Sequence, residues 1–209
     1  WGYGAYGGNS NTVYGGSLDN VVSITATQYA FAALKENDSV VTWGHTNSGG
    51  NPDCQLNYAV CSPAYGNIDS NVVSISFTDT AFAALRNDGS VVTWGRYDHG
   101  GRGGYTWVMD SGQMYGTNGE IPAAISSDVV SIQSNKDSFA ALKSDGTVYY
   151  WGSRFSGGSV SSAEVNTFLT IGGVTSIHSN DQAFVATKSD GSAVAWGSPW
   201  NGGVLPDNL

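Results

Sequence analysis

The chain repeats one sequence unit four times. Each copy opens on a Val-x-Ser-Ile segment, reaches a Trp-Gly pair 22 positions after its first valine, and closes with Gly-Gly after four variable residues. The first valines are Val21, Val72, Val129 and Val174, and the tryptophans are Trp43, Trp94, Trp151 and Trp196. A further tail of the same kind occupies residues 1–8. A unit of fixed length that recurs about every 50 residues indicates a propeller, a solenoid or another repeat array.

Three short strands are predicted in every unit. In the first copy they are Val21–Ile24, a segment around Phe31 that ends at Leu34, and the segment that runs into Trp43. These segments are rich in β-branched and aromatic residues, and they lack the spacing of an amphipathic helix. Because the same tryptophan ends the third strand of every unit, we expect it to pack between units or against the glycine-rich tail and not to bind a ligand.

The turn between the second and third predicted strands is the clearest local signal. Asp-Gly stands there in three units, at Asp88-Gly89, Asp145-Gly146 and Asp190-Gly191. This pair between two strand segments is typical of a tight hairpin. The first unit has Asn37-Asp38 instead, and Asn and Asp are the non-glycine residues that best tolerate positive φ. We therefore attribute these residues to backbone geometry and not to catalysis.

The connections between units vary in length while the units do not. They comprise residues 9–20, 51–71, 102–128 and 159–173. We expect each connection to hold a fourth, edge-type strand, for example Glu120–Ile125 or Asn166–Ile171. Three strands and an edge strand make one propeller blade. Insertions confined to one connection map to one face of a repeat protein, and that face is often the binding face.

Four motifs of the second unit resemble the repeat of the RCC1 (regulator of chromosome condensation) family. They are Ala81-Phe-Ala-Ala-Leu85, Asp88-Gly89, Trp94-Gly95 and Gly100-Gly101, and the other three units carry equivalents. The resemblance covers essentially the whole chain and implies an all-β, RCC1-like β-propeller built from four repeats of four-stranded antiparallel blades. Family members include a nucleotide-exchange factor on chromatin, a β-lactamase inhibitor and domains of ubiquitin ligases, which share protein binding and not chemistry.

A single RCC1-like repeat domain is predicted over residues 1–209, with units at approximately 1–43, 44–94, 95–151 and 152–209. Well-known members of the family close seven blades, so the four units could form a ring of their own, pair with a second chain, or belong to a larger ring. The chain begins at Trp1, inside a repeat, which favours a piece of a longer protein.

Charge excludes several classes of partner. The chain has 17 acidic residues against 8 Lys and Arg, and its net charge is -9. Nucleic-acid binding needs clustered Lys and Arg, as does binding to anionic lipid, so we expect neither. No apolar run approaches the length that spans a bilayer, so membrane insertion is not expected. The three histidines have no second metal ligand at suitable spacing, and no cofactor, metal or catalytic residue is predicted.

Candidate binding residues lie in the connections and tails. Exposed aromatic and methionine side chains there could anchor a protein partner or stack on a sugar ring. The candidates are Tyr105, Trp107, Met109, Tyr115 and Trp200, with Tyr3 and Tyr6 in the first tail.

Two further candidates are chemical modifications. Cys54 and Cys61 lie seven positions apart in one connection, either as free thiols or as a local disulfide that requires an oxidising compartment. Asn37-Asp38-Ser39 is an N-glycosylation sequon on a hairpin tip, which matters only in a eukaryotic secretory pathway.

Two functions are compatible with these features. The first is a non-catalytic repeat scaffold that binds a protein partner, or a second copy of itself, through its variable connections. The alternative is a secreted, lectin-like propeller that binds glycans, which the low charge, the cysteine pair and the sequon favour. An extracellular or secretory location is the matching expectation, and an enzyme is not expected.

Replacing Tyr105 and Trp107 by serine tests the predicted connection surface. We expect the proteins that the wild-type chain retains from an extract to be lost, while the melting temperature moves by less than about 2 °C, because exposed side chains add little to stability. Pull-down and thermal unfolding measure the two effects. A large loss of stability would instead place these aromatic residues in the core.

Overall fold

Each of the four units folds as a three-stranded antiparallel sheet. The computed structural model describes residues 2–9, 13–51, 68–101, 108–110, 113–115 and 123–205. The sheets are β1 (Val21–Ala26), β2 (Ala30–Lys35) and β3 (Val40–Gly44); β4 (Val72–Phe77), β5 (Ala81–Arg86) and β6 (Val91–Gly95); β9 (Val129–Ser134), β10 (Ser138–Lys143) and β11 (Val148–Gly152); and β12 (Val174–Ser179), β13 (Ala183–Lys188) and β14 (Ala193–Gly197). The second strand lies in the centre of every sheet, and the three strands predicted for each unit are confirmed.

Short elements fill the tails and the described parts of the connections. The tails contain the 3-10 turns η1 (Gly4–Tyr6), η2 (Thr46–Ser48), η3 (Tyr97–His99) and η5 (Pro199–Asn201), and the connections contain β7 (Val108–Asp110), β8 (Gln113–Tyr115), η4 (Ala123–Ile125) and the helix α1 (Ala163–Thr170). The tail after β11 is a turn.

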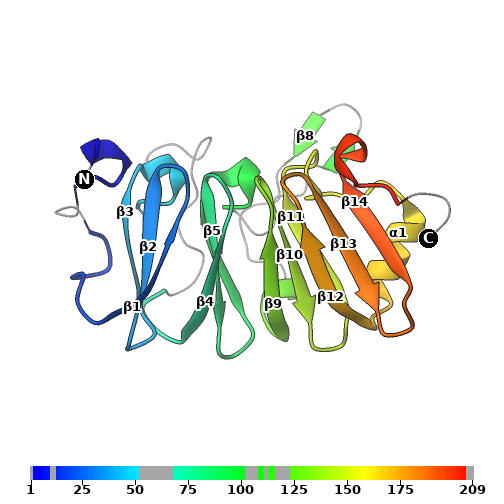
Figure 1. Cartoon of the computed structure of the whole chain (residues 1–209), viewed down its shortest axis with the longest axis horizontal. Coiled ribbons are helices and arrows are strands. Elements are labelled where there is room, and N and C mark those ends of the chain that lie inside the picture. Colours follow the sequence, from blue (N-terminus) through cyan, green and yellow to red (C-terminus); the bar gives the residue numbers. More distant parts are fainter. Residues whose placement is uncertain are drawn as a thin grey trace.

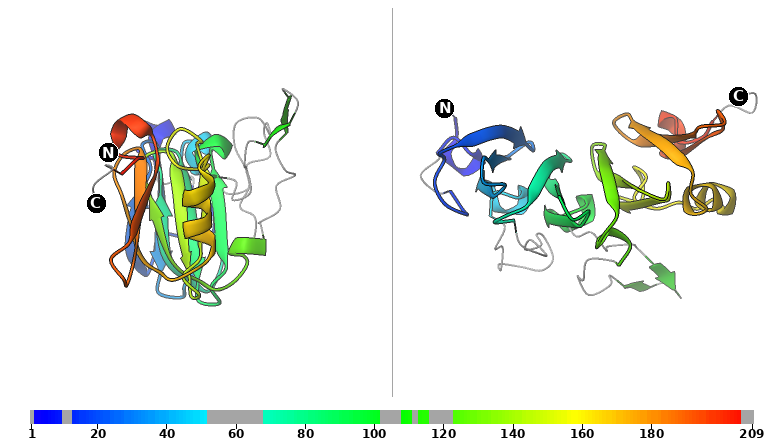
Figure 2. Two further views of the ribbon diagram at one scale, coloured as in Figure 1. Left: turned by 90° about the vertical axis from the view of Figure 1, so that its right-hand side faces the viewer. Right: turned by 90° about the horizontal axis from the view of Figure 1, so that it is seen from below.

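The four sheets stand side by side in a curved row (Figures 1 and 2). The first strands β1, β4, β9 and β12 contact one another in sequence and lie toward the concave side. Chain direction places the tails η1, η2, η3 and η5 along one edge, at the top of Figure 1, and the Asp-Gly hairpins along the opposite edge. We call these the tail edge and the hairpin edge.

The hairpins join neighbouring units as well as strands. Asp38 has φ 62° and Gly89 has φ 77°, as the residue types predicted. The backbone N–H of Val72 donates to the carbonyl of Asp38 (3.0 Å), and the N–H of Val129 donates to the carbonyl of Gly89 (3.0 Å). Each turn therefore accepts a hydrogen bond from the first strand of the next unit.

The tail of each unit covers the aromatic pair of the next. In unit 2 the rings of Phe82 and Trp94 are stacked at 5.2 Å, and the indole N–H of Trp94 donates to the carbonyl of Gly49 (3.1 Å). A Cβ atom on Gly49 would lie 2.5 Å from the Phe82 ring, so the backbone can approach only as glycine. The predicted packing of the repeated tryptophans against the tails is confirmed, because Trp94 and Trp151 are completely buried.

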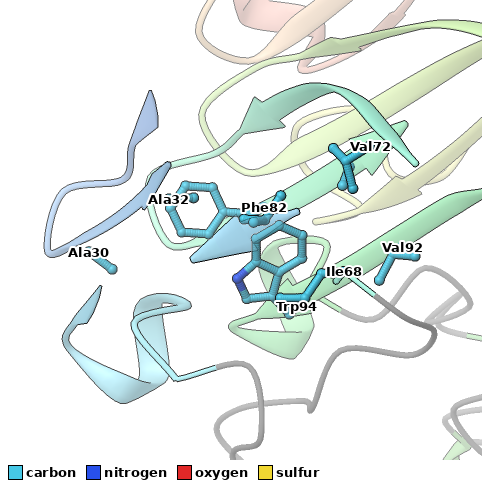
Figure 3. Close-up of a cluster of buried hydrophobic side chains, with 9 residues drawn as sticks. Ala30, Ala32, Ile68, Val72, Phe82, Val92 and Trp94 are labelled. Carbon is cyan, nitrogen blue, oxygen red and sulfur yellow. The ribbon is translucent and has the colours of Figure 1, made fainter. Parts of the chain in front are cut away.

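The core lies between units and not within one sheet. The alanines of one sheet, Ala30 and Ala32, pack against Phe82 and Trp94 of the next (Figure 3). Ile68, from the connection, completes this cluster. The equivalent residues at the next two junctions are Ile125 and Leu169. Small side chains on one face and large rings on the other interlock at the high density of a protein interior.

The prediction of a fourth strand is wrong at Asn166–Ile171. Most of this segment belongs to α1, which Ser162 caps by accepting a hydrogen bond from the N–H of Val165 (3.3 Å). The helix packs on the third strands β11 and β14 and buries Leu169. In the other proposed segment, the described residues Ala123–Ile125 form a 3-10 turn. The blades therefore have three strands in the described residues, and a single bridge from Tyr14 to Thr42 extends the first sheet.

Alanine substitutions at two equivalent tail glycines separate the two contributions to stability, the contact of the tail with the rings and the backbone strain at positive φ. Gly49→Ala should lower the free energy of unfolding by about 3 kcal/mol, because both a ring clash and a left-handed φ oppose the new Cβ. Gly202→Ala has the same φ strain, but its Cβ would meet only Asn180 Nδ2 at 3.6 Å, so about 1 kcal/mol is expected. Urea unfolding in dilute solution measures both, and equal losses would contradict the tail contact.

Candidate functional site

The structure places few of the predicted site residues. Cys54, Cys61, Tyr105 and Trp107 lie outside the described residues. Met109 and Tyr115 lie in the paired strands β7 and β8, where the backbone alone is described. Their partner-binding and disulfide roles stay predictions.

Trp200 and Asn37 lie at opposite edges of the sheets. Trp200 is in η5 on the tail edge and is 94% exposed, as a partner-binding residue requires. Asn37 is exposed on the hairpin edge, where its side-chain oxygen accepts hydrogen bonds from the Ser39 N–H and hydroxyl. The structure therefore does not bring these two candidates together, and glycosylation of Asn37 is untested.

The tail edge is where variable side chains gather. The glycines at both ends of the tails after β3, β6 and β11 lie close against the sheets, and the four residues between the two glycines differ from tail to tail. Tyr3, Tyr6, Phe155 and Trp200 all occupy these positions and are exposed. Phe155 was not predicted from the sequence, although its position between the two recurring glycine sites of a tail could have indicated it.

One aromatic cluster forms at the tail edge of unit 1. The ring of Tyr6 lies 5.2 Å from Tyr3, 4.9 Å from Tyr29 and 5.8 Å from His45. Tyr3 is 72% exposed, and Tyr6 and Tyr29 are also exposed. Tyr29 comes from the β1–β2 turn and was not predicted. Four rings from three separate segments thus make one continuous aromatic surface, which we call the tyrosine cluster.

A polar groove adjoins this cluster along the turns between first and second strands. It has a volume of about 470 Å³ and is lined by Gln28, Phe77, Thr78, Asp79, Ser134, Asn135, Lys136, Ser179, Asn180 and Asp181. A backbone ladder builds its floor: Gln28 N–H donates to the Asp79 carbonyl (2.9 Å), Asp79 to Lys136 (2.8 Å), and Lys136 to Asp181 (3.1 Å). Gln28 precedes Tyr29 in the chain, so one turn contributes a residue to the groove and a ring to the tyrosine cluster.

The electrostatics of the groove favour a cationic ligand. Burial raises the pKa of Asp79 above its ordinary value; the nearby carboxylates Asp137 and Asp181 raise it further, against the lowering effect of Lys136. Gln28 Nε2 donates to one oxygen of Asp79 (2.6 Å), and Lys136 Nζ lies 3.8 Å from the same oxygen. A partner ammonium or guanidinium group would lower the cost of the Asp79 charge.

A second ionic contact lies beside the groove. Burial raises the pKa of Asp137, but the His99 ring and the Ser156 hydroxyl lower it by more, and the net pKa is below the ordinary value. His99 Nδ1 lies 2.8 Å from Asp137 Oδ1, at ion-pair distance without hydrogen-bond alignment. This contact ties η3 of unit 2 to the first turn of unit 3, so its role is to position the tail.

The part of the chain that the structure describes includes neither a group of metal ligands nor a helix that could span a membrane. There, no three His, Cys, Asp or Glu side chains gather around a common point where a metal could bind. No helix in that part has the length and apolar character to cross a bilayer.

Known proteins match the chain by structure and not by sequence. No family model and no curated protein sequence matches it. Prp20p from Saccharomyces cerevisiae is similar at 18% identity with a TM-score of 0.52, over 90% of this chain and 51% of that chain. Human WBSCR16 is similar at 20% identity with a TM-score of 0.50, over 87% and 48%. A structure of Kap60 bound to yeast RCC1 (Prp20) also matches, at 18% identity and a TM-score of 0.50.

The fold is that of an RCC1-like propeller. At sequence identities this low, the structural similarity establishes the fold and no function. The chain spans about half the length of the solved structures it matches. The RCC1-like arrangement of antiparallel blades predicted from the motifs is therefore confirmed.

The pKa values of the two carboxylates, Asp79 and Asp137, should be displaced in opposite directions. We expect the pKa of Asp79 above, and that of Asp137 below, the ordinary value of about 3.9. The contribution of Asp79 to stability is therefore lost as the pH rises through its folded pKa, and that of Asp137 as the pH falls through its folded pKa. Carboxyl ¹³C NMR measures both; Asp137→Asn should lower the pKa of Asp79, and unchanged titration there would contradict the coupling.

Proposed function

We propose that the chain is a non-catalytic protein-interaction module whose tail edge binds a partner. The tyrosine cluster and the polar groove form the contact surface. The observation that carries the proposal is the exposed, continuous set of Tyr3, Tyr6 and Tyr29 beside a groove that contains Asp79. Tyrosines of this kind are enriched among the residues that contribute most to protein interfaces.

Charge indicates the chemistry of the partner. The net charge of -9 and the raised pKa of Asp79 favour a partner segment that carries Lys or Arg next to an apolar side chain. The cation would pair with Asp79, and the apolar group would pack on the tyrosine rings. Attraction between opposite charges would also accelerate association at low salt.

Structural relatives support protein binding in general terms. Prp20p has been characterised for its binding to Gsp1p and histones, and Kap60 binds yeast RCC1 (Prp20). We extend protein binding to this chain as a proposal, without extending those partners to it.

The polar contacts at the tail edge give no support to catalysis. Asp137 contacts both His99 and Ser156, so a carboxylate lies between the histidine and the serine. In a Ser-His-Asp triad the histidine lies between the other two and takes the serine proton. The present order positions a tail and does not activate a nucleophile.

Glycan binding is the second candidate function. Tyr3 and Trp200 are exposed rings of the kind that stack on sugars, and amide groups such as that of Asn180 lie in the groove. The predicted extracellular or secretory location belongs to this candidate. The aromatic surface is compatible with both functions, but the half-buried carboxylate of Asp79 favours a cationic peptide over a neutral sugar.

Selection from a displayed random-peptide library tests the proposed function. We expect enriched peptides to carry Lys or Arg beside an aromatic or aliphatic residue. Their affinity should fall roughly tenfold or more in the Tyr6→Ser, Tyr29→Ser double variant and in Asp79→Asn, because an anchor and its ion partner are removed. Surface plasmon resonance at two salt concentrations measures affinity and association rate.

Ile171→Ser is the control, because Ile171 is also an exposed hydrophobic residue but follows α1, away from the tail edge. Peptide affinity should be unchanged in this variant. Selected peptides that bind all variants equally, or binding of glycans in place of peptides on an array, would contradict the proposal.

A further inference from the structure

Three junctions between neighbouring units use the same set of contacts. The tail carbonyl of one unit accepts the indole N–H of the next, as from Trp94 to Gly49 and from Trp151 to Gly100, each at 3.1 Å. The hairpin carbonyl accepts from the first valine of the next unit. The turn between first and second strands extends the ladder along the groove. We call the face of a unit that supplies its tail and hairpin carbonyls to the next unit the donating face, and the opposite face, which carries the indole and valine N–H groups, the receiving face.

The last unit presents a donating face that the described residues cover only in part. A Cβ atom on Gly191, in the final hairpin, would meet nothing within 4 Å, whereas one on Gly89 would lie 2.6 Å from Asp128 N. Gly202, in the final tail, has no aromatic ring beside it, unlike Gly49. By strand register, Val185 stands where Ala32 stands in unit 1, and it is only half-buried.

The first unit presents a receiving face that is incompletely covered. Val21 is 36% exposed, although the equivalent Val72, Val129 and Val174 are 0%, 4% and 5% exposed. Leu18, three positions before Val21, is 38% exposed, whereas Ile68, four positions before Val72, is 6% exposed. Val21 and Leu18 are apolar, as the residues of a junction are, but no sheet of a preceding unit among the described residues covers them.

Residues 2–8 occupy part of that face as a substitute tail. They form the 3-10 turn η1, and Gly7 has φ 86°, close to the 92° of Gly49. The indole N–H of Trp43 donates to the Gly7 carbonyl (3.2 Å). The substitute tail supplies the carbonyl but not the alanine-lined sheet, which explains why Trp43 is buried while Phe31 is only half-buried and Val21 is exposed.

We propose that unit 4 of one copy docks on unit 1 of a second copy, and that the tail containing Gly202 replaces residues 2–8. The tail exchange conserves the bond to Trp43, because one glycine carbonyl replaces another. The net gain is burial of Val21, Leu18 and Val185 between two sheets. This surface differs from the tail-edge site of the proposed function, and the inference does not depend on that function.

The curvature of the row (Figure 2) and the length of the chain favour a closed pair over a filament. Donating and receiving faces are different surfaces, so their contact is heterologous and forms either a ring or a filament. The chain spans 51% and 48% of two RCC1-like structures, so two copies together have the length of one. Each copy then contributes one donating and one receiving face, and both junctions form at once.

Analytical ultracentrifugation of the full chain over a range of concentrations tests the inference. We expect a reversible species of twice 21.8 kDa. Gly202→Ala should weaken it roughly tenfold or more, because the new Cβ has room in the single chain but would meet Phe31 in the junction. Gly7→Ala should strengthen it, because its Cβ would lie 2.6 Å from the Phe31 ring and weaken the substitute tail.

Val21→Lys and Val22→Lys are a matched pair for the sheet contact. Val21 belongs to the proposed junction, whereas Val22 is exposed like its equivalents Val73 and Val130 within the row. The first substitution should abolish pairing and the second should not, with thermal unfolding confirming that both fold. A mass of 21.8 kDa at all concentrations, equal effects of the two lysines, or species larger than two copies would overturn the closed pair.

Discussion

The hydrogen bond from the tryptophan indole to a glycine carbonyl of the preceding unit is the contact on which the structure depends. It recurs at Trp94, Trp151 and Trp196 with the same length of 3.1 Å. An indole N–H that is buried without an acceptor would be destabilising, so burial of the ring requires the tail. The tail can approach the ring only because its glycine has no Cβ. Tryptophan and glycine therefore form one structural feature that spans two units.

Most of the fold could be predicted from the sequence because its determinants are local. Strand type follows from β-branched and aromatic residues, and hairpin position follows from Asp-Gly, or from Asn37-Asp38 where the glycine is missing. The role of the repeated tryptophans also followed from their constant position. Because the unit occurs four times, each strand and turn could be predicted from four versions of the same segment.

The connections could not be predicted in the same way because each occurs once. The segment Asn166–Ile171 has the residues of a strand, but the cap at Ser162 and the spacing of Val165, Phe168 and Leu169 make a helix with one apolar face. What is constant is the buried residue just before each first strand, Ile68, Ile125 or Leu169, which fills the junction whatever the connection forms. The tyrosine cluster was equally inaccessible, because Tyr6, Tyr29 and His45 come from three segments that only the folded chain brings together.

The contact that joins the units also displays the side chains that could bind a partner. Because Gly44 and Gly49 are held at opposite ends of their tail, the first three residues between them lie along the tail edge, while Ser48 is buried. Their identity does not affect the glycine contacts, so these positions tolerate Tyr3, His45, Phe155 or Trp200 in different units. The connections vary in length and must still present one apolar residue to a junction, whereas the tails vary in chemistry at fixed length. A row of units built in this way can change what it binds at the tail edge without changing how it packs.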